Sequence, residues 1–240
     1  MRRQETERGS MGQIHLLRHG QADLLGNDYD RLSELGREQA RLAGIALAAR
    51  GIRPVLVVSG QLRRQTGTAQ AAAEAAGWSA APSVDPDFDE YRHEDLFTTV
   101  HAHLPDHAAI AAFVARAENP RRAYQELFEC AFTAWAGGAT GTGGLSWAAF
   151  RQRVLAALGR VAERCGRGES AVVVTSGGVI AAIAQSLLGV PDAQVLKLHN
   201  PLHNASITRL LTQGRSISLS GFNDISHLTG TDDGRFVTYR

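Results

Sequence analysis

The residue in this sequence best suited to covalent chemistry is a histidine between an arginine and a glycine. Arg18, His19 and Gly20 end or follow the apolar-rich run Gln13–Arg18, which is typical of a buried strand. An imidazole with an ordinary pKa near ~6.5 offers a neutral nitrogen nucleophile at pH 7. The arginine can bind phosphate oxygens, and the glycine lets the backbone approach a ligand. We therefore expect His19 to take a phosphoryl group from a phosphate ester; a purely structural histidine is the alternative.

Two arginines stand at the start of a predicted helix. The sequence predicts a buried strand over Pro54–Ser59 and a helix over Leu62–Ala76, with Arg63 and Arg64 in its first turn. A helix N-terminus attracts anions, and an arginine there adds positive charge. We expect Arg63 to bind phosphate, whereas a place in a solvated basic patch is the stronger alternative for Arg64.

A carboxyl pair and a glycine pair complete the candidate chemistry. A carboxyl group in Asp89-Glu90 could protonate a leaving oxygen and later deprotonate water, unless the pair is simply exposed. Ser176-Gly177-Gly178 follows the strand predicted over Ala171–Thr175, where N–H groups at the next helix could hold a phosphate oxygen. This segment matches neither the GxxxxGK[ST] nor the GxSxG pattern, so a plain turn is the alternative.

Apolar strands that alternate with helices predict an α/β fold. Such strands form a mostly parallel sheet with helices on both faces, that is, a three-layer sandwich whose active site lies beyond the carboxyl ends of the strands. The further elements expected are helices over 33–50, 108–117, 121–136, 146–165 and 179–188 and strands over 206–211 and 216–222.

Composition narrows the class of protein. The 240 residues are 44% apolar and 20% charged, with a formal net charge of +1, which favours one core and argues against nucleic-acid or membrane partners. No apolar run is long enough to span a bilayer, so we expect a cytoplasmic protein. Residues 11–240 are expected to form one domain. Residues 1–10 are expected to be a disordered extension or an expression remnant.

Residues 92–144 break the alternating pattern and are expected to be a helical insertion over the site. His101, His103 and His107 cluster there, but residues two apart on a helix face different directions, so no metal is expected. The insertion reveals neither the substrate nor the oligomeric state, for which a dimer is one option.

The sequence resembles the histidine phosphatase superfamily, which is also called phosphoglycerate mutase-like. The resemblance covers most of residues 13–225 in the family's order. The segments that carry it are Leu16-Leu17-Arg18-His19-Gly20-Gln21, Leu32–Ala40, Ser59–Ala69, Phe88-Asp89-Glu90-Tyr91, Val172–Val179 and Asn204–Thr208.

The resemblance implies hydrolysis through a phosphohistidine, without a cofactor. His19 would be phosphorylated and Glu90 would act as acid and base, with a small phosphorylated molecule or a phosphoprotein as substrate. Arg18 and Arg63 would be catalytic residues that bind the phosphoryl group. The full set of phosphate-binding residues expected on this basis is Arg18, Arg63, Ser176, Gly177, Gly20 and Gln21.

Ser176 departs from the family pattern, because a second histidine usually precedes the glycine pair. Serine carries no positive charge, and a missing donor costs about 10²–10³ in rate. Three functions therefore stay open: a phosphatase, a phosphoglycerate mutase, and a catalytically weak module that binds a phosphorylated ligand. Histidines that could compensate are His93, His199, His203 and His227.

Overall fold

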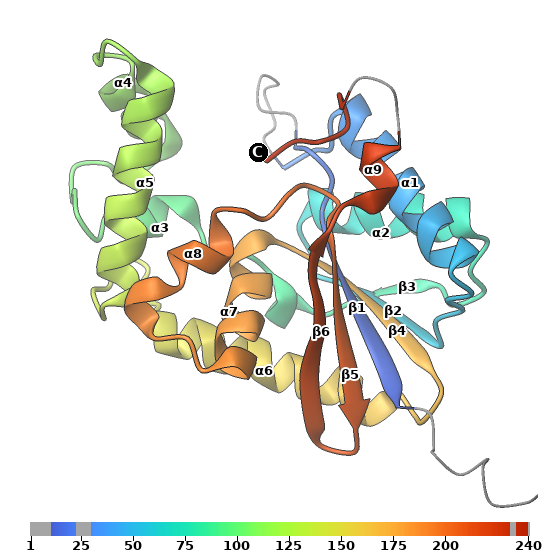
Figure 1. Cartoon of the computed structure of the whole chain (residues 1–240). Helices are drawn as coiled ribbons and strands as arrows, with labels where there is room; N and C mark the ends of the chain where they lie inside the picture. Colours follow the sequence, from blue (N-terminus) through green and yellow to red (C-terminus); the bar gives the residue numbers. More distant parts are fainter. Residues whose placement is uncertain (1–10, 23–29, 231–233, 240) are drawn as a thin grey trace, which may run out of the picture.

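A six-stranded mixed sheet forms the centre of the computed structural model, which describes residues 11–22, 30–230 and 234–239, apart from the side chain of His107 (Figure 1). The prediction for residues 1–10 lies outside the described residues. The strand order is β3-β2-β4-β1-β5-β6. The first four strands in this order are parallel to one another, β5 is antiparallel to β1, and β6 is antiparallel to β5. The strands are β1 (Gly12–Arg18), β2 (Leu56–Ser59), β3 (Pro82–Val84), β4 (Ser170–Thr175), β5 (Ile207–Gln213) and β6 (Ser216–Asp224).

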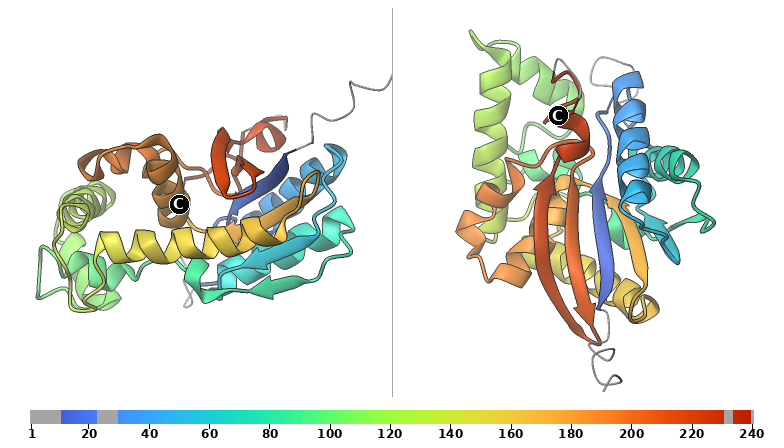
Figure 2. Two further views of the ribbon diagram at one scale, coloured as in Figure 1. Left: turned by 90° about the horizontal axis from the view of Figure 1, so that it is seen from below. Right: turned by 45° about the vertical axis from the view of Figure 1, so that its right-hand side comes forward.

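Helices cover both faces of the sheet, as the α/β prediction requires (Figure 2). Successive side chains of a strand point to opposite faces, so Leu16 of β1 packs toward α6 and α7, and Leu17 packs toward α1 and α2. The helices of these two layers are α1 (Glu34–Ala49), α2 (Arg63–Ala76), α6 (Trp147–Arg164), α7 (Gly177–Leu188) and α9 (Ser226–Thr229).

The predicted insertion forms helices to one side of the sheet, next to α7 and α8 (Figure 1). Phe128 and Phe132 join the core cluster that also holds Leu16, so the packing is continuous with the sheet. That this segment is an insertion covering the site stays a prediction. Its elements and the connection beyond α7 are α3 (His93–Phe97), α4 (His107–Val114), α5 (Pro120–Ala136) and α8 (Leu196–His199), and short 3₁₀ turns span Pro86–Phe88 and Asp192–Gln194.

Local sequence signals account for where α1 starts and stops. Ser33 accepts a hydrogen bond from the N–H of Gly36 and caps the first turn. The helix ends before Gly51, which has a φ of +79°. Glycine adopts this left-handed conformation more easily than other residues, and it commonly follows the end of a helix. Within the described part of the chain, no helix is both long and apolar enough to cross a membrane.

Candidate active site

His19 is fixed by the strands that flank it. Its N–H donates to the carbonyl oxygen of Thr175 at the end of β4 (2.8 Å), and its own carbonyl oxygen accepts from the N–H of Ala205 (3.1 Å). Asn204 Nδ2 reaches the same carbonyl oxygen at 3.4 Å. These contacts hold the residue in place, and it is buried, with 7% of its surface exposed. Such fixation favours in-line attack on a bound group.

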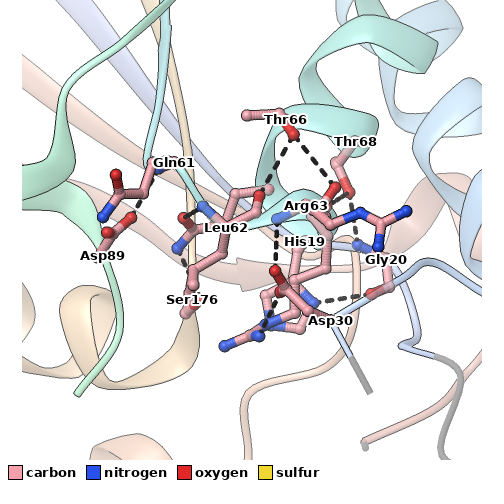
Figure 3. A network of polar contacts seen from close by, with 12 residues as sticks. His19, Gly20, Asp30, Gln61, Leu62, Arg63, Thr66, Thr68, Asp89 and Ser176 are labelled. Atoms are coloured by element: carbon pink, nitrogen blue, oxygen red, sulfur yellow. Dashed lines mark hydrogen bonds and ion pairs between the residues drawn. The ribbon is translucent and has the colours of Figure 1, made fainter. Parts of the chain in front are cut away.

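Hydrogen bonding determines which imidazole nitrogen can act as a nucleophile. His19 Nδ1 lies 2.8 Å from the carbonyl oxygen of Gly20, which can only accept, so Nδ1 carries the hydrogen (Figure 3). Nε2 therefore keeps its lone pair, and Arg64 Nε donates toward it at 3.3 Å. Burial, and then the positive charges of Arg64 and Arg18, lower the pKa of His19 well below its usual 6.5. The ring is neutral at pH 7.

The arginine against His19 is Arg64, which corrects the prediction of Arg63. The Arg64 side chain is buried and forms an ion pair with Asp30 at 2.7 Å, whereas Arg63 is exposed and its backbone N–H donates to Asp30 Oδ2 at 2.8 Å. Adjacent helical residues point in directions about 100° apart. Thr68, one turn after Arg64, faces the same way, because its Oγ1 accepts from the Gly20 N–H at 3.0 Å.

Arg18 also lies in the site, as predicted from its place next to His19. Its guanidinium donates to the carbonyl oxygen of Leu202 and is 8% exposed as a residue. A Cβ atom added to Gly177 would lie 3.7 Å from Arg18 Cζ, which places the guanidinium against the start of α7. The charge of Arg18 also affects the pKa of both His19 and Glu90, so these groups share one electrostatic environment.

Glu90 is held at the N-terminus of α7. Its Oε2 accepts from the N–H of Gly178 at 2.9 Å, and burial raises the pKa of the carboxyl above its usual 4.5, against the effect of that hydrogen bond. A Cβ at Gly178 would lie 2.3 Å from Glu90 Oε1, so only glycine admits the carboxyl there. The expectation that this N–H holds phosphate is therefore corrected, since Glu90 occupies it. The neighbouring Asp89 accepts from the N–H of Gln61 (2.7 Å) instead.

Ser176 and Gly177 lie where β4 passes into α7, next to His19 and Arg18. Ser176 is fully buried, and its Oγ accepts from Gln65 Nε2 at 2.9 Å. Gly177 packs against His199, with 3.3 Å between the position of an added Cβ and His199 Nε2. Sequence reasoning missed Gln65, although its position next to Arg64 in the first turn of α2 was a usable signal.

Gly20 and Gln21 have structural roles that the sequence did not reveal. Gly20 donates its N–H to Thr68, and an added Cβ would lie 2.1 Å from the carbonyl oxygen of Gly36. Gln21 donates its N–H to Gln39 Oε1 at 2.8 Å. Both N–H groups thus have protein acceptors, which corrects the prediction for Gly20, since the N–H is its only donor. Phosphate binding by Gln21, whose side-chain amide is a further donor, stays a prediction. Gly20 is required for the approach of α1 to the end of β1, not for that of a ligand.

The histidines expected to compensate for Ser176 fall into two groups. His227 Nε2 lies 3.0 Å from the carbonyl oxygen of Ala205, and His203 contacts Asn223, so both have other partners. His199 and Arg18 both lie next to Gly177, and His93 is near enough for its charge to lower the pKa of His19. Of these four, His93 and His199 are therefore the ones that border the site.

His101 and His103 pack against each other, with 5.2 Å between ring centroids, and both contact Phe113. Among the described residues, no group of three or more histidine, cysteine or carboxylate side chains is arranged to hold a metal ion. The side chain of His107 lies outside that description.

The arrangement brings together a neutral imidazole, two guanidinium groups and a carboxyl with a raised pKa. Guanidinium groups bind and neutralise phosphate oxygens, the imidazole nitrogen can attack phosphorus, and a protonated carboxyl can supply the leaving oxygen with a proton. The site is therefore equipped for phosphoryl transfer to His19.

Solved structures with this fold include two mycobacterial proteins. One is titled mycobacterial hydrolase 1 (30% identity, TM-score 0.62), and one is a mycobacterial glucosyl-3-phosphoglycerate phosphatase (28% identity, TM-score 0.61); each match covers 88% of this chain and 98% of the other. YhfR of Bacillus stearothermophilus shares the fold at 19% identity, with a TM-score of 0.66 over 90% of this chain and 98% of that protein.

Sequence comparison gives two results. No curated protein is similar in sequence. The family model of the histidine phosphatase superfamily (branch 1) matches residues 14–225, a range that includes His19, Arg64, Glu90 and Ser176. The chain therefore belongs to the histidine phosphatase superfamily.

Proposed function

We propose that this chain is a phosphoric monoester hydrolase that carries the phosphoryl group on Nε2 of His19. The observation that carries the proposal is the fixed tautomer: Nδ1 is occupied by the Gly20 carbonyl oxygen, and the lone pair of Nε2 is directed to the side where Arg64 lies. A guanidinium next to the free nitrogen can bind the group that this nitrogen attacks, which a purely structural role for His19 would not explain. Glu90 with its raised pKa supplies the acid.

The reaction has two steps, and Glu90 acts as the acid in the first and as the base in the second. In the first, Nε2 attacks phosphorus, the bond from phosphorus to the ester oxygen breaks, and Glu90 gives its proton to that oxygen. In the second, the Glu90 carboxylate takes a proton from water, the resulting hydroxide attacks phosphorus, and the N–P bond breaks. Inorganic phosphate leaves, and the starting protonation states are restored. Arg18 and Arg64 neutralise the phosphoryl oxygens throughout.

The substrate proposed is a small phosphorylated molecule, with a phosphoprotein as the other option. The similarity to a glucosyl-3-phosphoglycerate phosphatase makes glucosyl-3-phosphoglycerate one compound to test. A phosphoglycerate mutase from Bacillus anthracis has the same fold at 16% identity, which supports no transfer of its activity. A cytoplasmic location, a possible dimer and the lack of nucleic-acid or membrane partners stay predictions.

Hydrolysis of p-nitrophenyl phosphate, glucosyl-3-phosphoglycerate, 3-phosphoglycerate and phosphoserine by the wild type and by His19→Ala tests the proposal. We expect turnover by the wild type and none by the variant. No turnover of any ester by the wild type would refute it. Thermal protection by inorganic phosphate without turnover would instead indicate the binding module, which the loss of the second histidine at Ser176 favours.

A further inference from the structure

Ser176 has a buried hydroxyl whose own hydrogen has no acceptor in the described part of the chain. Its oxygen accepts from Gln65 Nε2 at 2.9 Å, and no other side-chain hydrogen bond of Ser176 occurs among the described residues. The residue is fully buried, next to the residues of the site. Buried polar hydrogens are rarely left unpaired in proteins, because this costs about 1–3 kcal/mol. The hydroxyl therefore fits a ligand that accepts a hydrogen bond.

The orientation of the Gln65 amide follows from its backbone partners. Oε1 accepts from the N–H of Leu62 (3.3 Å), and Nε2 donates to the carbonyl oxygen of Phe88 (3.2 Å). Exchanging the oxygen and the nitrogen would place N–H against N–H and oxygen against oxygen. Gln65 is fully buried and its Oε1 lies against Gly60, so the two backbone partners decide the orientation of the amide. Nε2 consequently presents its second hydrogen to Ser176.

A serine hydroxyl that accepts from an amide keeps its hydrogen and a second lone pair, and toward a phosphoryl oxygen, which can only accept, it can use only the hydrogen. Ser176 adjoins Thr175, whose carbonyl oxygen accepts from the His19 N–H at 2.8 Å, and Gln65 adjoins Arg64, which contacts His19 Nε2. The same first turn of α2 thus orients the serine and the guanidinium. Hydrogen bonds in a chain also polarise one another, which strengthens the donor at its end.

We infer that Gln65 is a positioning residue that makes Ser176 a hydrogen-bond donor to the phosphoryl group, at the place where the family usually has a histidine. This inference rests on the phosphoryl transfer proposed above. Ser176, oriented by Gln65, supplies an uncharged hydrogen-bond donor to the phosphoryl group. Arg18 and Arg64 supply the positive charge that neutralises the phosphoryl oxygens. Vanadate and the phosphoryl group in transfer have oxygens that can accept this hydrogen bond.

Four variants test the pair: Ser176→Ala, Gln65→Met, the double variant, and Gln70→Met as a matched control. Gln70 lies on the exposed side of the same helix and donates to Glu74 at 2.9 Å. We expect kcat/KM for p-nitrophenyl phosphate to fall by about 10²-fold in Ser176→Ala and about tenfold in Gln65→Met. The double variant should be no slower than Ser176→Ala, and Gln70→Met should match the wild type.

The affinity for vanadate, measured by thermal protection, separates positioning from a structural role and does not need turnover. Vanadate binding should weaken in parallel with kcat/KM, and inorganic phosphate binding should weaken less. The inference is overturned if Gln65→Met binds vanadate within twofold of the wild type. It is also overturned if Gln65→Met lowers the affinity for vanadate as much in the Ser176→Ala background as in the wild type. An inactive wild type would refute the proposed function, whereas the vanadate comparison would still decide this inference.

A second variant covers the case in which Gln65→Met does not fold. When the introduced side chain of Gln65→Glu is ionised, it can only accept, so the Ser176 hydroxyl donates to it and not to the ligand. When the carboxyl is protonated, it can still donate to the Ser176 oxygen, as the glutamine amide does. Vanadate affinity should therefore fall with rising pH more steeply than in the wild type, and this extra slope should vanish in Gln65→Glu with Ser176→Ala. An equal slope in both backgrounds would overturn the inference.

Discussion

Replacing Arg64 and Arg63 by alanine, one at a time, separates two neighbouring arginines that the structure places in opposite environments. Arg64 is buried, donates toward His19 Nε2 and pairs with Asp30, whereas Arg63 is exposed. Both changes remove one positive charge from the first turn of α2. Any difference in rate between them therefore reports the contact with the phosphoryl group and not the overall charge.

The magnitude follows from the contact that each variant loses. Removing one oriented donor to a developing negative charge costs about 2.7–4 kcal/mol, or 10²–10³ in rate, and we expect Arg64→Ala to lie in this range. Arg63→Ala should stay within about twofold in rate and about 0.5 kcal/mol in stability, as exposed substitutions do. The Arg64 charge also lowers the pKa of His19, so Arg64→Ala should move the acid limb of the pH–rate profile to higher pH.

The assay is kcat/KM for p-nitrophenyl phosphate from pH 4 to 8, with the free energy of unfolding measured for both variants. The unfolding data show whether the loss of the Asp30 ion pair, rather than the loss of the donor, explains the lower rate. Equal losses in the two variants, or an Arg64→Ala enzyme that keeps more than a tenth of the wild-type activity, would refute the assignment of Arg64.

Three further predictions concern the acid, the glycine pair and the core. Glu90→Gln should remove the alkaline limb of the pH–rate profile, because the raised pKa keeps the carboxyl protonated above pH 4.5 in the wild type. It should lower kcat/KM, which reports the first step, far more for alkyl phosphates than for p-nitrophenyl phosphate; an equal fall in kcat/KM would argue against an acid role. Gly178→Ala should lower the rate by displacing Glu90, whereas Gly159→Ala in α6, which has open space, should leave the rate unchanged and stabilise by about 0.5–1 kcal/mol in urea unfolding. His15 is buried, and its pKa is lowered to about 4, so the unfolded chain binds a proton below pH 6.5 that the folded chain refuses until about pH 4. Stability should therefore fall between pH 6.5 and 4 by about 3 kcal/mol from this group, and His15→Leu should flatten that slope in urea unfolding; an unchanged slope would contradict it.

Most of the fold could be predicted because the central strands are apolar on both faces. The run that ends at Arg18 and the run that ends at Thr175 pair in the middle of the sheet, where both faces are covered. The strand Pro82–Val84 was missed, because it is an exposed edge strand of three residues without an apolar pattern. Edge strands of this kind leave little signal in a sequence.

The site could be predicted in its residue types but not in all its contacts. His19, Arg18 and Glu90 were expected, and the structure brings them together. The choice between Arg63 and Arg64 depended on which face of α2 turns inward, and only the structure shows this, because Arg64 and Thr68, one turn apart, are both buried. The contact between Glu90 and Gly178 spans 88 residues, and no local pattern reveals such a pairing.

The central claim is that the phosphoryl group passes through one nitrogen of one histidine. The direct test is to mix Glu90→Gln with p-nitrophenyl phosphate, whose leaving group needs no acid, so that the intermediate accumulates when water is not activated. Peptide mass spectrometry and ³¹P NMR of the trapped protein should then show phosphate on Nε2 of residue 19. Phosphate on Nδ1 or on another residue, or turnover by His19→Ala, would contradict the account.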